Sequence, residues 1–396
     1  MKKFKVCFII FALLLCIFAL NSCNSDLSPD FKESYPELGN DFVNRNIVIN
    51  RHYNDILTVS DGWIAVGRLY GAPLDAVIAK YDNNGEVVWE NAFGGSDLDE
   101  FYSVAEISDG YIVIAGCHSV DGDLLGLDET NRGSSHTITV KYDRDGNKVW
   151  AKELPANTIV ANEGGFLAAY HYNGIYIIQF DVEGNIIWSK SIGNSLTLYN
   201  GTNNLNVVKI LKGQEGYFLF GKTRNVGSFG DFSEGPGFIA AMNADGNVIW
   251  QKKVSMYEIE DVTISTDGII IVGVSYNEEP PYRLPCVKKF DFEMNIIWET
   301  SYEKNYYLNF TKAAEIGGNI FVAGFTQDKN DRSFVFGINA SGEIFWENVC
   351  KENKDSVIYY NVFSVDEKIV VYRHAYNYGA SSIVENTFLF YDLASI

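Results

Sequence analysis

The sequence predicts an all-β fold, a seven-bladed β-propeller of four-stranded antiparallel blades, from two repeating patterns. One begins at residues 80–89, Lys-Tyr-Asp-Asn-Asn-Gly-Glu-Val-Val-Trp, and recurs five more times, always with Trp seven residues after an Asp or Asn. The other is a short turn before an apolar run, whose second residue stands at positions 62, 110, 164, 216, 268, 318 and 367. Seven units of about fifty residues follow, and such a period built from short strands is typical of a propeller.

Each unit contains four expected strands, A to D. Strand A precedes the first turn, B follows it, C runs into the Asx-x-x-Gly turn and D carries the Trp. Glycine suits the C–D turn because it accepts positive φ, although Met294 replaces it in the fifth copy. One indole in each of six blades is expected to fill the space between adjacent sheets. These residues are Trp89, Trp150, Trp188, Trp250, Trp298 and Trp346.

The ends of the repeat array predict how the ring closes. The seventh unit supplies strands A, B and C but no Trp-bearing strand before Ile396. Residues 44–50 form an apolar-centred run with no C–D turn ahead of it, so we expect it to pair with residues 387–392. Such pairing would complete the last blade and remove exposed sheet edges. The propeller is therefore expected to span residues 43–396.

The N-terminus has the pattern of an export signal. Lysines near the start precede a continuous apolar run over residues 6–20, which is too short for a comfortable membrane span. Residues 20–23, Leu-Asn-Ser-Cys, resemble a bacterial lipobox, in which the cysteine is lipid-modified. We expect residues 1–22 to be a lipoprotein signal peptide, Cys23 to carry the lipid, and residues 23–42 to form a flexible tether. The expected location is the bacterial cell envelope, at the outer membrane.

Charge and cysteine content restrict the partners. The formal charge is −20, with 51 acidic and 31 basic residues. Nucleic acid is not an expected partner, because binding it needs a basic face, and the membrane is expected to be reached through the lipid anchor only. Cys117, Cys286 and Cys350 fall within the propeller, an odd number without close spacing. Neither a disulfide framework nor a Cys-based zinc site is expected, and no cofactor is implied.

The two ends of the ring are expected to differ. The A–B and C–D turns are short and share one end, which we call the turn face. The B–C and D–A connections share the other end, which we call the variable face, and they differ most in length. Variable loops on a rigid scaffold are where binding usually occurs.

The candidate site lies at the variable face, where strand B ends. Three of the five histidines fall at one equivalent position there, and aromatic or hydrogen-bonding residues follow directly. The candidate ligand-binding residues are His118, His171, His374, Tyr70, Tyr172, Arg224 and Tyr276. The alternative is that these strand-end groups simply bond neighbouring blades. A metal site is not expected, because blades 2, 3 and 7 cannot all bring a ligand within about 2.1 Å of one ion.

An acidic stretch in blade 2 has some features of a calcium loop. Residues 121–129 read Asp-Gly-Asp-Leu-Leu-Gly-Leu-Asp-Glu, but Leu125 and Arg132 stand where an EF-hand needs ligands. A calcium site and an ordinary solvated loop both remain open. The sequence contains no nucleophile elbow, His-Glu-x-x-His helix or phosphate loop.

Residues 75–118 are similar to secreted bacterial propeller repeats of the seven-bladed SBBP, or delta-60, type. They share Asp-Ala-x-x-x-Lys-x-Asp-x-x-Gly-x-x-x-Trp, followed by Phe-Gly-Gly, Asp-Glu and Asp-Gly. The Trp turn also resembles pyrroloquinoline-quinone (PQQ) repeats. Those repeats prefer Thr immediately before the Gly, where this chain has Asn84, Asp145, Glu183, Asp245 and Ser341. The resemblance implies an exported propeller lipoprotein and no particular activity.

Two functions from different classes fit these features. The first is a non-catalytic binding or scaffold module of the envelope, whose ligand is a protein or a glycan held at the variable face. The alternative is a glycan-active enzyme, a lyase or hydrolase, with His, Tyr and Arg of the rim as acid–base groups.

Overall fold

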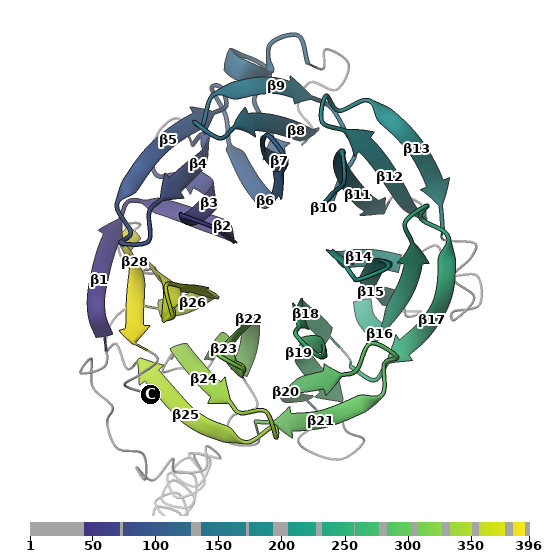
Figure 1. Ribbon diagram of the computed structural model, residues 1–396. Coiled ribbons are helices and arrows are strands. Elements are labelled where there is room, and N and C mark those ends of the chain that lie inside the picture. The colour runs from purple at the N-terminus through teal and green to yellow at the C-terminus, as the bar shows by residue number, and fades with distance from the viewer. Residues whose placement is uncertain are drawn as a thin grey trace, which may run out of the picture. The chain divides into compact units, whose positions relative to one another are not determined.

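The computed structural model describes residues 43–71, 74–127, 136–171, 174–192, 205–226, 232–256, 258–276, 283–302, 308–326, 333–350, 356–376 and 383–392. These residues belong to one compact unit, Asn40–Ile396. Seven four-stranded antiparallel sheets are arranged around a central axis (Figure 1). The predicted fold class is confirmed.

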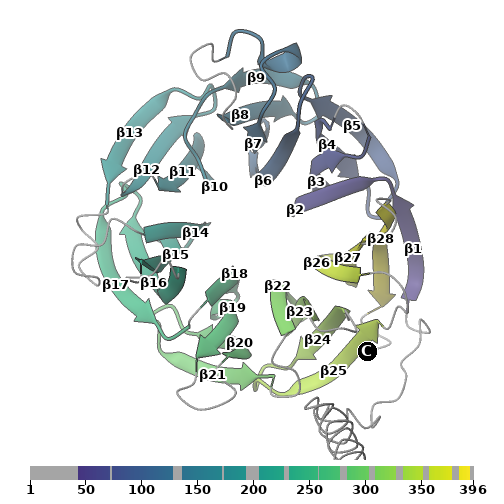
Figure 2. The same ribbon diagram turned by 180° about the vertical axis from the view of Figure 1, so that it is seen from behind.

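In every blade the strands run outward from A at the centre to D at the rim, as Figure 2 also shows from behind. Blade 1 comprises β2 (Arg51–Val59), β3 (Gly62–Leu69), β4 (Ala76–Tyr81) and β5 (Val87–Phe93). Blade 2 comprises β6 (Asp99–Ile107), β7 (Gly110–Cys117), β8 (His136–Asp143) and β9 (Lys148–Lys152), and blade 3 comprises β10 (Thr158–Asn162), β11 (Gly165–His171), β12 (Ile175–Asp181) and β13 (Ile186–Ser191). Blade 4 comprises β14 (Leu205–Lys212), β15 (Gly216–Val226), β16 (Phe232–Asn243) and β17 (Val248–Val254).

Blades 5 to 7 repeat this order. Blade 5 comprises β18 (Glu258–Ser265), β19 (Gly268–Tyr276), β20 (Arg283–Phe290) and β21 (Ile296–Ser301). Blade 6 comprises β22 (Leu308–Ile316), β23 (Asn319–Thr326), β24 (Ser333–Ile338) and β25 (Ile344–Cys350), and blade 7 contains β26 (Ser356–Val365), β27 (Lys368–Tyr376) and β28 (Ile383–Asp392). One short 3₁₀ helix, Gly122–Leu124, follows β7. Within the described ranges, no helix is long and apolar enough to span a membrane.

The N-terminal strand β1 (Val43–Ile49) is the fourth and outermost strand of blade 7. It pairs antiparallel with β28, from Val43 opposite Tyr391 to Ile49 opposite Asn386. Figure 1 shows the purple N-terminal strand lying beside the yellow C-terminal one. The predicted closure is confirmed. With β1 in place, blade 7 has four strands like every other blade and packs against blade 1.

Seven apolar clusters hold the blades together, one between each adjacent pair. Because side chains alternate across a strand, each blade contributes to two of these clusters. On β3, Ile64 and Val66 face blade 2, whereas Trp63 and Ala65 face blade 7. Each sheet is therefore buried on both faces, which one blade could not achieve alone.

The repeated Trp of one blade lies over the C–D turn of the next. At that turn the side-chain oxygen of the Asp or Asn accepts backbone N–H bonds, as Asp82 does from Asn84 and Glu86 at 2.9 Å each. The turn Gly leaves room for the indole. A Cβ added there would lie 2.6 Å from Trp89 at Gly146, 3.1 Å from Trp150 at Gly184, 2.3 Å from Trp188 at Gly246 and 2.9 Å from Trp298 at Gly342.

The junction between blades 7 and 1, which we call the seam, lacks this Trp and is filled differently. Ile47 of β1, Phe390 and Trp63 surround the turn Gly85. Trp63 is fully buried and stacks on Tyr81 at 5.2 Å between ring centroids. The repeat pattern predicted no role for Trp63, because Trp63 lies on strand B rather than at the repeated Trp position of strand D.

Charged residues link the innermost strands. Lys209 of β14 lies 2.7 Å from Asp261 of β18, and Lys312 of β22 lies 3.8 Å from Asp261 and 3.7 Å from Asp55 of β2. Burial alone would raise the pKa of Asp261, but the two ammonium groups outweigh it and hold this pKa below its ordinary value. Asp55 and Asp261 each also accept a backbone N–H of the following blade. Asp261 therefore links the adjacent blades 4, 5 and 6 near the axis, and the Lys312–Asp55 pair links blade 6 to blade 1 past blade 7.

Candidate functional site

The structure separates the three predicted rim histidines. His118 is exposed just beyond β7, and His171 is partly exposed at the end of β11. The backbone N–H of His118 donates to Asp99, and that of His171 donates to Asn157, each within its own blade. His374, in contrast, is buried on β27 at the seam.

The other predicted rim residues are only partly described. Tyr172 lies outside the described residues. Arg224 lies on β15 and Tyr276 on β19, where the structure describes the backbone and not these side chains. Arg224 is opposite Glu234 of β16, so it lies in a strand rather than in a loop. Among the predicted residues whose side chains are described, Tyr70 and His374 are the pair brought into contact.

Tyr70 and His374 belong to a polar group that also contains His52 and Asn386, which we call the seam cluster. Nδ1 of His374 lies 2.6 Å from Oδ1 of Asn386 and 3.2 Å from the Tyr70 hydroxyl. The Asn386 amide donates to that hydroxyl at 3.1 Å and to the backbone oxygen of Arg51. The ring of His52 meets His374 edge-on, with centroids 4.8 Å apart.

Both seam histidines are held in the neutral form near neutral pH. Burial, followed by the neighbouring His374 and Arg68, lowers the pKa of His52 to about 3. Burial also lowers the pKa of His374, with a further contribution from Arg68, although its bond to Asn386 opposes this. His374 of blade 7 thus bonds to Asn386 and contacts Tyr70 and His52 of blade 1, so the cluster joins the two blades. The sequence shows His52 as a histidine at the start of strand A but carries no signal of its contact with His374.

The Phe-Gly-Gly motif that carries the family resemblance is explained by one buried carboxylate. Asp99 accepts the N–H of Gly95 at 2.9 Å, those of His118 and Ser119 at 3.1 and 3.3 Å, and the Ser119 hydroxyl at 2.6 Å. A Cβ on Gly94 would lie 2.5 Å from this carboxylate. The motif therefore fixes the D–A connection against the B–C connection of blade 2.

The acidic residues predicted as a possible calcium loop also make local bonds. Asp121 accepts the N–H of Ser96 at 2.7 Å, and Asp123 accepts that of Gly94 at 3.3 Å. Asp123 also forms an ion pair with Lys148. Residues 128 and 129 lie outside the described ranges, and the described residues contain no group of three or more His, Cys, Asp or Glu placed to hold a metal.

Cys117 and Cys286, the cysteines whose side chains the structure describes, are buried and free. Burial raises the pKa of the Cys117 thiol, and it raises that of Cys286 to about 11. A thiol acts as a nucleophile in its ionised form, so both are structural at neutral pH.

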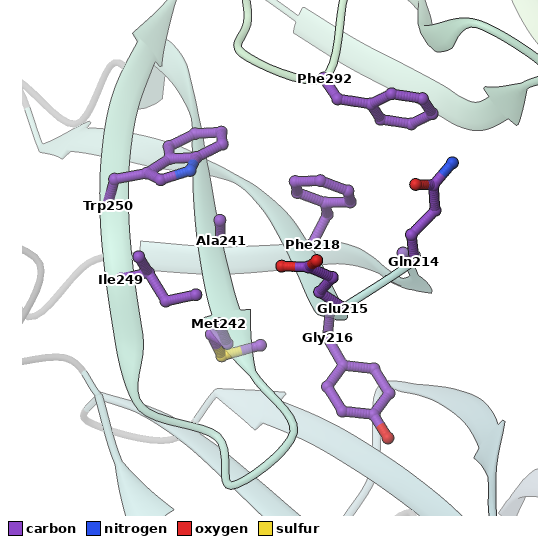
Figure 3. Close-up of a pocket in the computed structure, with 11 residues that line it drawn as sticks. Gln214, Glu215, Gly216, Phe218, Ala241, Met242, Ile249, Trp250 and Phe292 are labelled. Carbon is purple, nitrogen blue, oxygen red and sulfur yellow. The ribbon is translucent and has the colours of Figure 1, made fainter.

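A cavity of about 160 Å³ opens on the turn face, between blades 4 and 5 (Figure 3). Its walls come from the β14–β15 turn, from β16 and β17, and from the C–D turn of blade 5. It is lined by Gly213, Gln214, Glu215, Gly216, Tyr217, Phe218, Ala241, Met242, Ile249, Trp250 and Phe292. The sequence predicted binding on the opposite face, and this cavity was not among the candidate sites.

The chain resembles solved propellers in structure. A scan of protein-family models and a search of curated proteins find no match. Drosophila Semaphorin 2a is similar with a TM-score of 0.54 and 8% identity, over 89% of this chain and 75% of that chain. Extracellular domains 1–2 of Drosophila Semaphorin 1b are similar with a TM-score of 0.51 and 8% identity, over 89% of this chain and 87% of that chain.

The β-propeller domain of the Trilobed protease from Pyrococcus furiosus is similar with a TM-score of 0.50 and 12% identity, over 86% of this chain and 94% of that chain. That domain is described as having an open velcro topology, whereas β1 closes the ring here. At these identities the likenesses show the fold alone. The chain is a seven-bladed β-propeller.

The seam cluster predicts that acid weakens the fold. Between pH 6.5 and about 3 the unfolded chain binds a proton that folded His52 does not, so the free energy of unfolding falls as the pH drops. His52 alone should account for a loss of about 2 kcal/mol between pH 7 and pH 5. Urea unfolding at both pH values measures it. His52→Asn should remove this part of the loss, and His118→Asn, at an exposed position, should not. An unchanged pH dependence in His52→Asn would contradict the assignment.

Proposed function

We propose that the protein is a non-catalytic binding or scaffold module that holds a protein or glycan ligand on its variable face. The observation that carries the proposal is the contrast between a closed, repetitive scaffold and connections of unequal length. On the variable face, β7 ends at Cys117 and β8 begins at His136, whereas β11 ends at His171 and β12 begins at Ile175. Such variation on a rigid ring is typical of binding surfaces.

The positions of the rim histidines favour binding over the alternative of a glycan lyase or hydrolase. General acid–base catalysis needs groups within hydrogen-bond reach of one reacting centre. His118 and His171 lie in different blades, and His374 is buried against Asn386 at the seam. Exposed His118 and partly exposed His171 remain suited to contacts with a ligand that covers several blades.

A screen of the full chain against glycans and envelope proteins tests this function. We expect a ligand whose binding weakens on replacement of His118 or His171 by Ala, and no turnover of that ligand. The control is Glu367→Gln, which lies on the turn face and should leave binding unchanged. Turnover of a glycan that is lost in His118→Ala, with folding intact, would instead support the enzyme.

We further propose that the protein is an exported lipoprotein of the SBBP-like kind, anchored at the outer membrane through Cys23. The support is the basic, apolar leader followed by Leu-Asn-Ser-Cys at residues 20–23. The polar stretch to residue 42 would then separate the propeller from the bilayer.

Replacement of the proposed lipid attachment site tests this anchor. The unmodified chain should incorporate a labelled fatty acid and sediment with outer membranes, and Cys23→Ser should do neither. Cys117→Ser, in the buried core, is the control and should keep the label. A Cys23→Ser chain that still carries the label would refute the assignment.

A further inference from the structure

The cavity on the turn face lies where the repeat departs from its own pattern. In blades 2, 3, 4 and 6 the turn Gly lies directly against the Trp of the preceding blade. In blade 5 this position is Met294, which has a φ of 64° and is buried. Met294 and Trp250 belong to the same apolar cluster between blades 4 and 5. Trp250 also packs on Phe218, with ring centroids 6.1 Å apart.

Two further departures meet at the same place. Phe292 follows the Asx of the C–D turn, where the other turns have smaller or polar side chains, namely Asn83, Arg144, Val182, Ala244 and Ala340. The A–B turn of blade 4 is also longer: β14 ends at Lys212 and β15 begins at Gly216, whereas β2 ends at Val59 and β3 begins at Gly62. The additional chain length brings Gln214 and Glu215 to the cavity. Packing of the repeat alone requires none of these changes.

The cavity combines aromatic faces with one negative charge. Phe218 and Phe292 are nearly parallel, with an angle of 13° and centroids 6.4 Å apart. Both rings and Trp250 are partly exposed, and the exposed Glu215 lines the same cavity (Figure 3). Glu215 is the one charged residue among those that line the cavity, within a chain of formal charge −20. Aromatic faces and a carboxylate both attract cations.

The repeat itself places ammonium groups on its indoles. The Nζ atoms of Lys152, Lys190 and Lys252 lie 5.3, 5.2 and 5.6 Å from the ring centroids of Trp150, Trp188 and Trp250. Phe218 of blade 4 and Phe292 of blade 5 add two more aromatic rings next to Trp250. None of the described residues that line the cavity is a lysine or an arginine.

The size of the cavity sets the size of the ligand group. About 160 Å³ is below the roughly 300–1,000 Å³ of small-molecule sites and suits a single side chain. We propose that the cavity on the turn face receives a lysine or arginine side chain of a partner protein, between Phe218, Phe292 and Trp250 and next to Glu215. This site is independent of the ligand proposed for the variable face, and the acidic chain would attract a basic partner.

Peptide titrations of the full chain test this proposal. The probes are a Gly-Ser peptide with one Lys, the same peptide with Arg, its acetyl-lysine counterpart, and a panel of monosaccharides. Phe292→Leu, which stays apolar but loses the ring, and Glu215→Gln should each weaken binding of the Lys and Arg peptides about tenfold. The acetyl-lysine peptide should bind the unmodified protein as weakly as the Lys peptide binds these two variants.

Two matched controls separate the site from general attraction by an acidic protein. Glu367→Gln removes the same charge from the A–B turn of blade 7, and Phe345→Ala removes an exposed aromatic side chain of blade 6. Both should leave peptide affinity within about twofold, and all four variants should keep the thermal midpoint of the parent. Equal weakening by Glu215→Gln and Glu367→Gln, no measurable peptide binding, or a monosaccharide whose binding alone depends on Phe292 would each overturn the proposal.

Discussion

The contact between one blade's Trp and the next blade's turn is the interaction on which the ring depends. A single four-stranded sheet has two apolar faces and can bury them only against neighbours. Each of the seven junctions therefore holds its own apolar cluster, and the indole caps most of them at the turn face. Because the burial is pairwise, a ring with one open junction would expose two faces at once. Closure is thus a condition of stability for the whole array.

The seam meets this condition by other means. The outermost strand of blade 7, β1, has no Trp. Ile47, Trp63 and a group of Tyr and Phe residues fill the space instead. The hydroxyls of Tyr53 and Tyr81 lie 2.7 Å apart, and Tyr372 accepts the N–H of Tyr53 at 2.9 Å. The seam cluster continues this bonding to the variable face. Residues that looked like ligand-binding groups at the rim, Tyr70 and His374, are therefore engaged in closing the ring.

The sequence predicted the blades, their number and the strand that closes them, because the period and the Trp column depend on local chemistry. It did not predict which residues of the rim come into contact. Equivalent positions in a repeat share a height along the axis, but blades 2, 3 and 7 point in different directions, so His118 and His171 remain apart from His374. His52 was overlooked because it belongs to another strand, and three-dimensional pairing across the seam is needed to bring it to His374. The cavity could not be predicted from the sequence, because it depends on how Phe218 and Trp250 of blade 4 lie relative to Phe292 of blade 5.

The most direct test of this account compares two Gly→Ala variants with the same backbone requirement. Gly246 and Gly164 have φ of 76° and 89°, so Ala costs both a similar strain. A Cβ at Gly246 would lie 2.3 Å from Trp188, whereas nothing lies within 4 Å at Gly164. If the indole contact holds the blades together, urea unfolding should show Gly246→Ala to be less stable than Gly164→Ala by about 1–3 kcal/mol. Equal free energies of unfolding for the two variants would contradict the central claim.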